Sequence, residues 1–91
     1  MSEIQVELLV QNQKGLHARA AAAFVKSISE YDAEVTVSKN GQEVDGSSIL
    51  GLMMLGASQG STIVVKASGN QAEEAIKAVS VLVNSLFGEE V

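Results

Sequence analysis

The sequence predicts an α+β domain in which three helices cover one face of a four-stranded antiparallel sheet, in the order β-α-β-β-α-β-α. Two observations carry this prediction. Apolar and polar residues alternate along the predicted strands, as they do in an antiparallel sheet with one face in water. Between these strands, apolar residues recur at the i, i+3, i+4 spacing of helices that bury one face. With 91 residues, we expect a single domain over residues 1–91.

Short alternating segments predict the four strands. They are IQVELLV from Ile4, AEVTVS from Ala33, QEV from Gln42 and STIVVKAS from Ser61. Asn40-Gly41, between the second and third segments, is the strongest short signal for a tight hairpin. The strand residues expected to face the core are Ile4, Val6, Leu8, Val10, Val35, Val37, Ile63, Val65 and Ala67.

The helical spacing predicts three helices. The first runs from Ala18 to about Tyr31, and the second is a short helix between Ser48 and Gly56. The third helix starts near Asn70 and ends before Gly88. Asn70 and Glu73 form a pattern that resembles a capping box. The apolar residues of the three helices are Ala21, Phe24, Val25, Ile28 and Tyr31 in the first, Ile49, Leu50, Leu52, Met53 and Leu55 in the second, and Ala72, Ala75, Ile76, Val79, Leu82, Val83 and Leu86 in the third.

Composition excludes several classes of function. A formal net charge of −5 and only three aromatic residues argue against nucleic-acid and anionic-membrane binding. With no cysteine and one histidine, we expect no disulfide and no metal site, and no motif indicates a cofactor. The acidic start MSEIQVELL lacks the basic residues of a signal peptide, and no apolar run reaches membrane-spanning length, so we expect a cytoplasmic protein.

The single histidine stands at the predicted start of the first helix. His17 lies within KGLHARAAAAFVK, directly before the alanine-rich run, with Arg19 two residues on. Unpaired backbone N–H groups and the helix dipole favour an anion at such a position. A cation such as Arg19 is unfavourable at a helix start, and its presence is more easily explained if an anion binds there. A neutral imidazole is also a competent nucleophile. The pattern indicates a histidine that meets or carries a phosphate, while a solvent-exposed histidine beside a surface arginine remains the alternative.

The segment DGSSILGLMMLG offers a second candidate region. Ser47 or Ser48 before an apolar run is typical of an ordinary helix N-cap, and the alternative is a phosphorylation switch. The run itself is too apolar for a short helix with one buried face. Part of it is expected to be core, and the rest to form an exposed patch for protein contacts.

Two segments together resemble a known family. GLHARAAAAFV resembles the active-site motif of HPr, the histidine-containing phosphocarrier of the phosphoenolpyruvate-dependent sugar phosphotransferase system. SSILGLMMLGASQGSTIVVKASG resembles the family's regulatory-serine helix and the strand after it, and the likeness runs from about Ile4 to Gly88. The resemblance implies an open-faced β-sandwich and a cytoplasmic, monomeric carrier in sugar transport and its regulation. Such a protein is a phosphoryl-transfer intermediate rather than a free-standing enzyme.

The resemblance also assigns roles to residues. His17 would accept the phosphoryl group on Nδ1 from Enzyme I and pass it to an EIIA domain. Arg19 and the backbone N–H groups from Ala18 onward, including Ala20, would support the phosphoryl oxygens. Ser48 would be the target of HPr kinase/phosphorylase where a cell has that enzyme. The residues that align with the partner-docking patch are Ile49, Leu50 and Met53.

The sequence departs from the family pattern at two positions. Ala20 stands where the family usually has proline, and Ser47 where many relatives have lysine. The acidic balance and the ending NSLFGEE also resemble the nitrogen-type branch, which serves regulation more than sugar uptake. The likeness to the nitrogen-type branch leaves open a regulatory binding protein with the same fold. A small acidic chain with a serine before an apolar helix also leaves open an acyl-carrier-like protein, although that class is all-helical and the alternating strands and Asn40-Gly41 argue against it.

Overall fold

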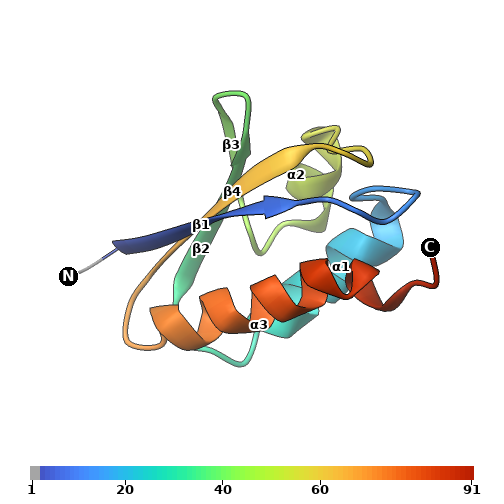
Figure 1. The fold of residues 1–91 in the computed structure, drawn as a ribbon. Helices are drawn as coiled ribbons and strands as arrows, with labels where there is room; N and C mark the ends of the chain where they lie inside the picture. The colour runs from blue at the N-terminus through green and yellow to red at the C-terminus, as the bar shows by residue number, and fades with distance from the viewer. Residues whose placement is uncertain (1–2) are drawn as a thin grey trace.

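The computed structural model describes residues 3–91 and confirms the predicted fold class. Figure 1 shows the sheet with the helices packed against it. The elements, in chain order, are β1 (Glu3–Leu9), α1 (Ala18–Ile28), β2 (Glu34–Lys39), β3 (Gln42–Asp45), α2 (Ile49–Met54), β4 (Thr62–Ser68), α3 (Ala72–Asn84) and the short 3-10 helix η1 (Leu86–Gly88). A four-stranded sheet is incompatible with the all-helical, acyl-carrier-like alternative.

The sheet has the strand order β1-β4-β2-β3, and every neighbouring pair is antiparallel. The hairpin between β2 and β3 turns at Asn40 and Gly41, with φ values of 52° and 85°. Two successive positive φ values match the right-handed twist of the flanking strands, which is why this dipeptide is favoured there.

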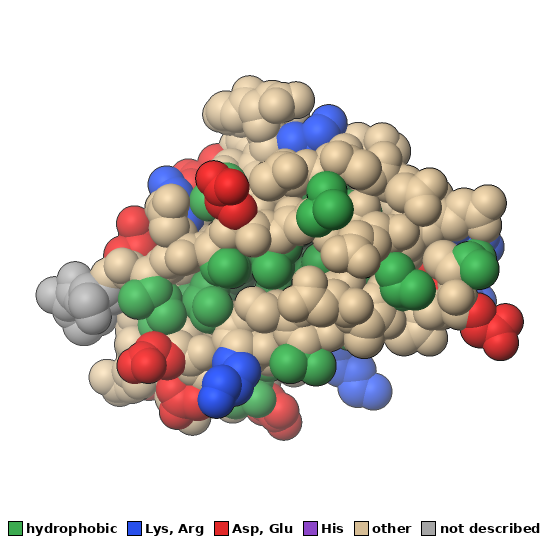
Figure 2. All heavy atoms as spheres, in the orientation of Figure 1, with side chains coloured by type: hydrophobic (Ala, Val, Ile, Leu, Met, Phe, Trp, Pro, Cys, Tyr) green, Lys and Arg blue, Asp and Glu red, His purple; other side chains and the backbone are tan. Residues whose placement is uncertain are grey.

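One hydrophobic core lies between the sheet and the helices. Val37, Ile63 and Val65 from the central strands are fully buried, as is Phe24 from α1. Ile4 and Val6 are half-buried against the same core, while Leu9 is exposed, so β1 alternates as its sequence predicts. On the face of the molecule shown in Figure 2, acidic and basic side chains are interspersed and apolar side chains lie between them. No helix within residues 3–91 is both long and apolar enough to cross a membrane.

Two helix ends differ from the prediction. The first helix ends at Ile28, because the chain then tightens into hydrogen bonds from Ser29 N to Lys26 O and from Tyr31 N to Ile28 O. Tyr31 still packs against the core from outside the helix.

The start of α3 also differs. Its N-cap residue is Gln71 and makes no side-chain capping bond, while the Asn70 amide donates to the Asp32 carboxylate. The predicted capping box is therefore wrong, because contacts with the loop before β2 decide the conformation of both residues. Gln71 takes part in the same contact, since its Oε1 accepts a bond from Asp32 N at 2.7 Å.

The loop between β1 and α1 is attached to the loop before β4. Leu16 N donates to Ala57 O at 2.8 Å, and Val10 exchanges backbone hydrogen bonds of 2.8 Å with Ser61 and Gly60. Gly15 lies in the left-handed region, with φ +65°, directly beneath Ala57 and Ser58. A Cβ at position 15 would overlap Ala57 O and lie 2.8 Å from Ser58 Cα. Only glycine fits this position, and the position fixes where α1 begins.

Gly15→Ala is expected to destabilise the protein far more than Gly56→Ala. Both glycines have φ +65°, but a Cβ at position 56 meets nothing within 4 Å. Gly56→Ala should therefore lower the free energy of unfolding by about 1–2 kcal/mol, the cost of the left-handed backbone alone. Gly15→Ala adds an overlap with backbone atoms, and we expect a total loss of about 3 kcal/mol or more. Urea unfolding of the two variants measures the difference, and equal losses would show that the loop moves aside.

Candidate functional site

His17 is the N-cap residue of α1. Its backbone is extended, with φ −80° and ψ −177°, and its carbonyl accepts the first intrahelical bond, from Ala21 N at 2.8 Å. The side chain makes no capping hydrogen bond to the first turn. The N–H groups of residues 18–20 precede the first intrahelical donor and have no acceptor within the helix. The imidazole thus lies at a helix start whose backbone donors can serve an anion.

The imidazole contacts the other end of the chain. Nε2 of His17 is hydrogen-bonded to Oε2 of Glu89, and the two side chains are 28% and 15% exposed. Oε1 of Glu89 accepts a bond of 2.9 Å from Nδ2 of Asn12. Asn12 is fully buried, and the same Nδ2 donates to Gly15 O at 2.8 Å. These bonds join the β1–α1 loop, the start of α1 and the C-terminal segment into one cluster.

The electrostatics of the cluster favour an ionised Glu89. The largest cause that lowers the pKa of this carboxyl group is the hydrogen bond from Asn12, and the second is the hydrogen bond from His17. The positive charge of Lys14 makes a smaller contribution in the same direction. Burial opposes the shift without reversing it. A carboxylate that accepts two hydrogen bonds is stabilised in its charged form.

Arg19 lies beside His17 on the surface. Both side chains line a depression of about 380 Å³, together with Lys14 and the segment 87–91. Arg19 and Ala18 are exposed, while Ala20 is fully buried beneath the first turn. The structure therefore brings the predicted histidine and arginine together, and adds a second cation and a carboxylate that the sequence patterns did not single out.

Ser48 is the N-cap residue of α2. Its Oγ accepts a bond from Gly51 N at 2.9 Å, so the ordinary capping role that the sequence predicts is confirmed. Ser47 instead makes two bonds to Oδ1 of Asp45, from its backbone N at 2.9 Å and its hydroxyl at 2.8 Å. These two bonds lower the pKa of Asp45.

The short helix α2 buries little of its apolar surface. Leu52 is fully buried and Leu55, directly after the helix, is 5% exposed. Four large apolar side chains remain in solvent and are here called the α2 patch: Ile49, Leu50, Met53 and Met54, of which Leu50 and Met54 are 68% and 66% exposed. The sequence predicts that this apolar run, Met54 included, divides between core and exposed surface, and the structure confirms it. Met54 is exposed beside the three residues that the resemblance aligns with the docking patch. The patch has the apolar character of a protein-contact surface.

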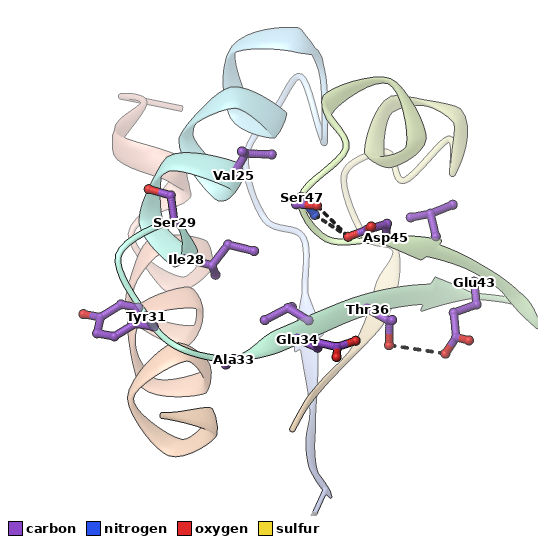
Figure 3. A pocket seen from close by; sticks show the side chains of 12 residues that line it. Val25, Ile28, Ser29, Tyr31, Ala33, Glu34, Thr36, Glu43, Asp45 and Ser47 are labelled. Carbon is purple, nitrogen blue, oxygen red and sulfur yellow. Dashed lines mark hydrogen bonds between the residues drawn. The ribbon is translucent and has the colours of Figure 1, made fainter. Parts of the chain in front are cut away.

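A larger groove, of about 480 Å³, lies between α1 and the β2–β3 hairpin and does not include His17. Figure 3 shows Val25 and Ile28 of α1, and Ser29 directly after this helix, on one side of the groove and Glu34, Glu43 and Asp45 on the other. Three carboxylates make this groove unsuitable for a phosphate. No group of residues within 3–91 is arranged to hold a metal ion.

Comparison with known proteins identifies the family. The model of the HPr component of the phosphotransferase system, described by its phosphorylation site, matches residues 4–85. The phosphocarrier protein HPr of Xylella fastidiosa is 41% identical over 87 residues, which cover 96% of this chain and 98% of that protein. The phosphocarrier protein NPr of Shewanella violacea is 36% identical over 89 residues, 98% of each chain. The chain belongs to the HPr family of phosphocarrier proteins.

Solved structures agree with this assignment. A crystal structure of HPr from Thermoanaerobacter tengcongensis superposes with a TM-score of 0.87, at 44% identity and with all of both chains covered. A second structure from that organism, described as an HPr dimer, gives 0.76 at the same identity, covering 98% of this chain and 100% of that one. The predicted open-faced β-sandwich is thereby confirmed.

Sequence reasoning missed Asn12, Glu89 and Phe87. Asn12 lies in a segment for which the sequence predicts only a polar turn, yet the structure buries it fully. Glu89 is 72 residues from His17, and no local pattern indicates a contact at that separation. The one available signal was Phe87, a large apolar residue just beyond the third helix, which the structure buries to 6% exposure.

The lowered pKa of Glu89 predicts an acid-dependent loss of stability. A carboxyl group whose pKa in the folded state lies below its ordinary value of 4.5 stabilises the fold at higher pH, and loses that contribution as the pH falls through the folded value. Glu89→Gln should therefore show a shallower loss of stability than the native protein between about pH 5 and about pH 3. Urea unfolding across this range provides the measurement. Glu90→Gln, at the exposed neighbouring position, is the control and should keep the native pH profile.

Proposed function

We propose that this protein accepts a phosphoryl group on Nδ1 of His17 from phosphorylated Enzyme I and passes it to an EIIA domain. The observation that supports this best is the placement of the chain's one histidine as the N-cap of α1, beside Arg19 and open backbone donors. Membership of the HPr family gives the class of reaction, and the geometry supports the identity of the acceptor.

The hydrogen bond to Glu89 supports Nδ1 as the reacting nitrogen. Nε2 of His17 is engaged by the carboxylate, and a ring nitrogen that donates to a carboxylate has no lone pair to offer. In the neutral ring the lone pair is then on Nδ1. The same nitrogen attacks phosphorus and later carries the phosphoryl group to the next protein.

Phosphoryl oxygens on Nδ1 would meet the first turn of α1. Ala18 and Arg19 are exposed, so their backbone N–H groups and the Arg19 guanidinium are donors that such an anion could use. The N–H of the buried Ala20 lies deeper and supports the anion mainly through the helix dipole. Charge-assisted hydrogen bonds from Arg19 offset the cost of a cation at a helix start once the phosphoryl group is present.

The α2 patch supports a docking role for Ile49, Leu50 and Met53, with the adjacent Met54. An apolar surface with two methionines adapts to more than one partner, which a carrier between two proteins requires. Ser48 caps the same helix, so its phosphorylation by HPr kinase/phosphorylase would place a charge at the edge of the docking surface.

The protein that finally receives the phosphoryl group differs between two versions of this proposal, a sugar-type carrier and a nitrogen-type regulatory protein. Relatives named HPr and NPr both match over nearly the whole chain, so membership of the family is compatible with either a sugar-type carrier or a nitrogen-type regulatory protein. The EIIA domain that receives the phosphoryl group from His17 distinguishes them. We expect the carrier to act as a cytoplasmic monomer in either case.

His17→Ala should abolish phosphorylation by phosphoenolpyruvate and Enzyme I. His17 is the only histidine in the chain, and it carries little core packing, so the variant should fold normally. Intact mass after incubation should show one acid-labile phosphoryl group on the native protein and none on the variant. An undiminished acid-labile gain in a folded His17→Ala protein would refute the assignment.

Ser48→Asp should weaken binding to Enzyme I without unfolding the protein. Aspartate is a good N-cap, so the melting temperature should stay within a few degrees of the native value. A partner that closes over the α2 patch must desolvate the new charge, and we expect a loss of roughly tenfold in affinity.

Ser47→Asp is the matched control for this variant. Ser47 precedes the cap and bonds to Asp45, so a charge there should affect stability more than binding. Affinity from calorimetric titration and melting temperature should be measured on both variants. A larger affinity loss at Ser47 than at Ser48 would leave Ser48 as a helix cap alone.

A further inference from the structure

Glu89 reaches His17 only because the chain reverses sharply after α3. Leu86, Phe87 and Gly88 have φ values of 63°, 55° and 79°, three successive residues in the left-handed region. Two of them are not glycine, and such conformations persist only where surrounding contacts hold them. Phe87 supplies that contact, since its side chain is 6% exposed in the core. The backbone bond from Glu89 N to Leu86 O, at 2.9 Å, closes the turn.

The carboxylate is held from its other side by a buried amide. Nδ2 of Asn12 donates both to Oε1 of Glu89 and to the carbonyl of Gly15, at 2.9 Å and 2.8 Å. Oδ1 of Asn12 is buried and has no hydrogen-bond partner within residues 3–91. Burying an unpaired carbonyl oxygen costs free energy. The orientation of the Asn12 side chain therefore favours the two hydrogen bonds that Nδ2 donates, at the expense of a partner for Oδ1. Both oxygens of Glu89 are thus committed, one to the scaffold and one to the imidazole.

We propose that Glu89 is a positioning residue for the phosphoryl transfer that His17 performs, an inference that rests on the function proposed above. Its carboxylate accepts the proton on Nε2 and so keeps the lone pair on Nδ1. A carboxylate that holds an imidazole in one tautomer in this way is familiar from serine hydrolases. Here it would serve attack on phosphorus by Nδ1.

The same contact serves both directions of transfer. When Nδ1 attacks, a bond from Nδ1 to phosphorus forms, the bond from phosphorus to the donor breaks, and its electron pair stays with the donor. The ring keeps its proton on Nε2 and becomes cationic, and the Glu89 carboxylate balances that charge. On transfer to the acceptor, the bond between Nδ1 and phosphorus breaks and its electron pair returns to Nδ1. No proton has to enter or leave Nε2 in either step.

Glu89→Gln tests this role in the 91-residue chain, with Glu7→Gln as the matched control at an exposed position of β1. The glutamine has one oxygen for two donors, Asn12 and His17, and carries no charge. Two readouts apply: ¹⁵N NMR of the neutral His17 ring, which reports the tautomer without any partner, and the kcat/KM of phosphorylation by Enzyme I. Melting temperatures check that each variant is folded.

In the native protein we expect the neutral His17 ring to be protonated at Nε2. In Glu89→Gln we expect a mixture of the two tautomers. The kcat/KM of this variant should be lower by roughly tenfold, which corresponds to the loss of a hydrogen bond to a charged group. Glu7→Gln should match the native protein in both readouts. A folded Glu89→Gln protein with a native tautomer, or with a native kcat/KM, would overturn the positioning role. Neither result bears on the proposed function, which fails only if His17→Ala is still phosphorylated.

Discussion

The hydrogen bond from Leu16 N to Ala57 O is the contact on which the site depends. It holds the residue before His17 against the loop that precedes β4, and Gly15 turns left-handed so that the two backbones can approach to 2.8 Å. The end of β1 is tied to the same loop by the bonds of Val10. The start of α1 is therefore fixed by backbone geometry before any side chain of the site is considered. A surface histidine gains a defined position in this way without a buried pocket.

The C-terminal segment meets the start of α1 for a physical reason. The helix α3 crosses β1 and β4 and ends near the start of α1, so a short reversal returns the C-terminal segment to His17 (Figure 1). That reversal uses strained backbone at Leu86 and Phe87, stabilised by burial of the phenyl ring. Burial of Phe87 in the core thus supports a polar contact made two residues further along the chain, at Glu89. Strain of this kind is found where geometry serves a site, which agrees with the role inferred for Glu89.

The sequence predicts those features of this structure that depend on local periodicity. Strand alternation, the Asn40-Gly41 turn and the buried stripe of α3 are confirmed because side-chain burial and backbone period are coupled in regular elements. Helix ends depend on hydrogen bonds that apolar spacing does not report, so the spacing predicts a helix to about Tyr31 while α1 ends at Ile28. His17 and Arg19 could be singled out because they adjoin a helix start. Asn12 and Glu89 could not, because their 77-residue separation is bridged only by the tertiary fold.

In the proposed carrier, charged side chains would stabilise the phosphoryl group at His17, and the apolar α2 patch would bind the partner proteins. The chain has a net charge of −5, and a phosphoryl group would add about two more negative charges at His17. Lys14 and Arg19 lie in the same depression and offset that addition locally. The α2 patch, in contrast, contains no ionisable group, so the docking proposed for it would be independent of the state of His17. A carrier has to bind its donor when unphosphorylated and its acceptor when phosphorylated. An apolar docking surface meets both demands, and the adjoining Ser48 is the position where a charge would alter binding in both states.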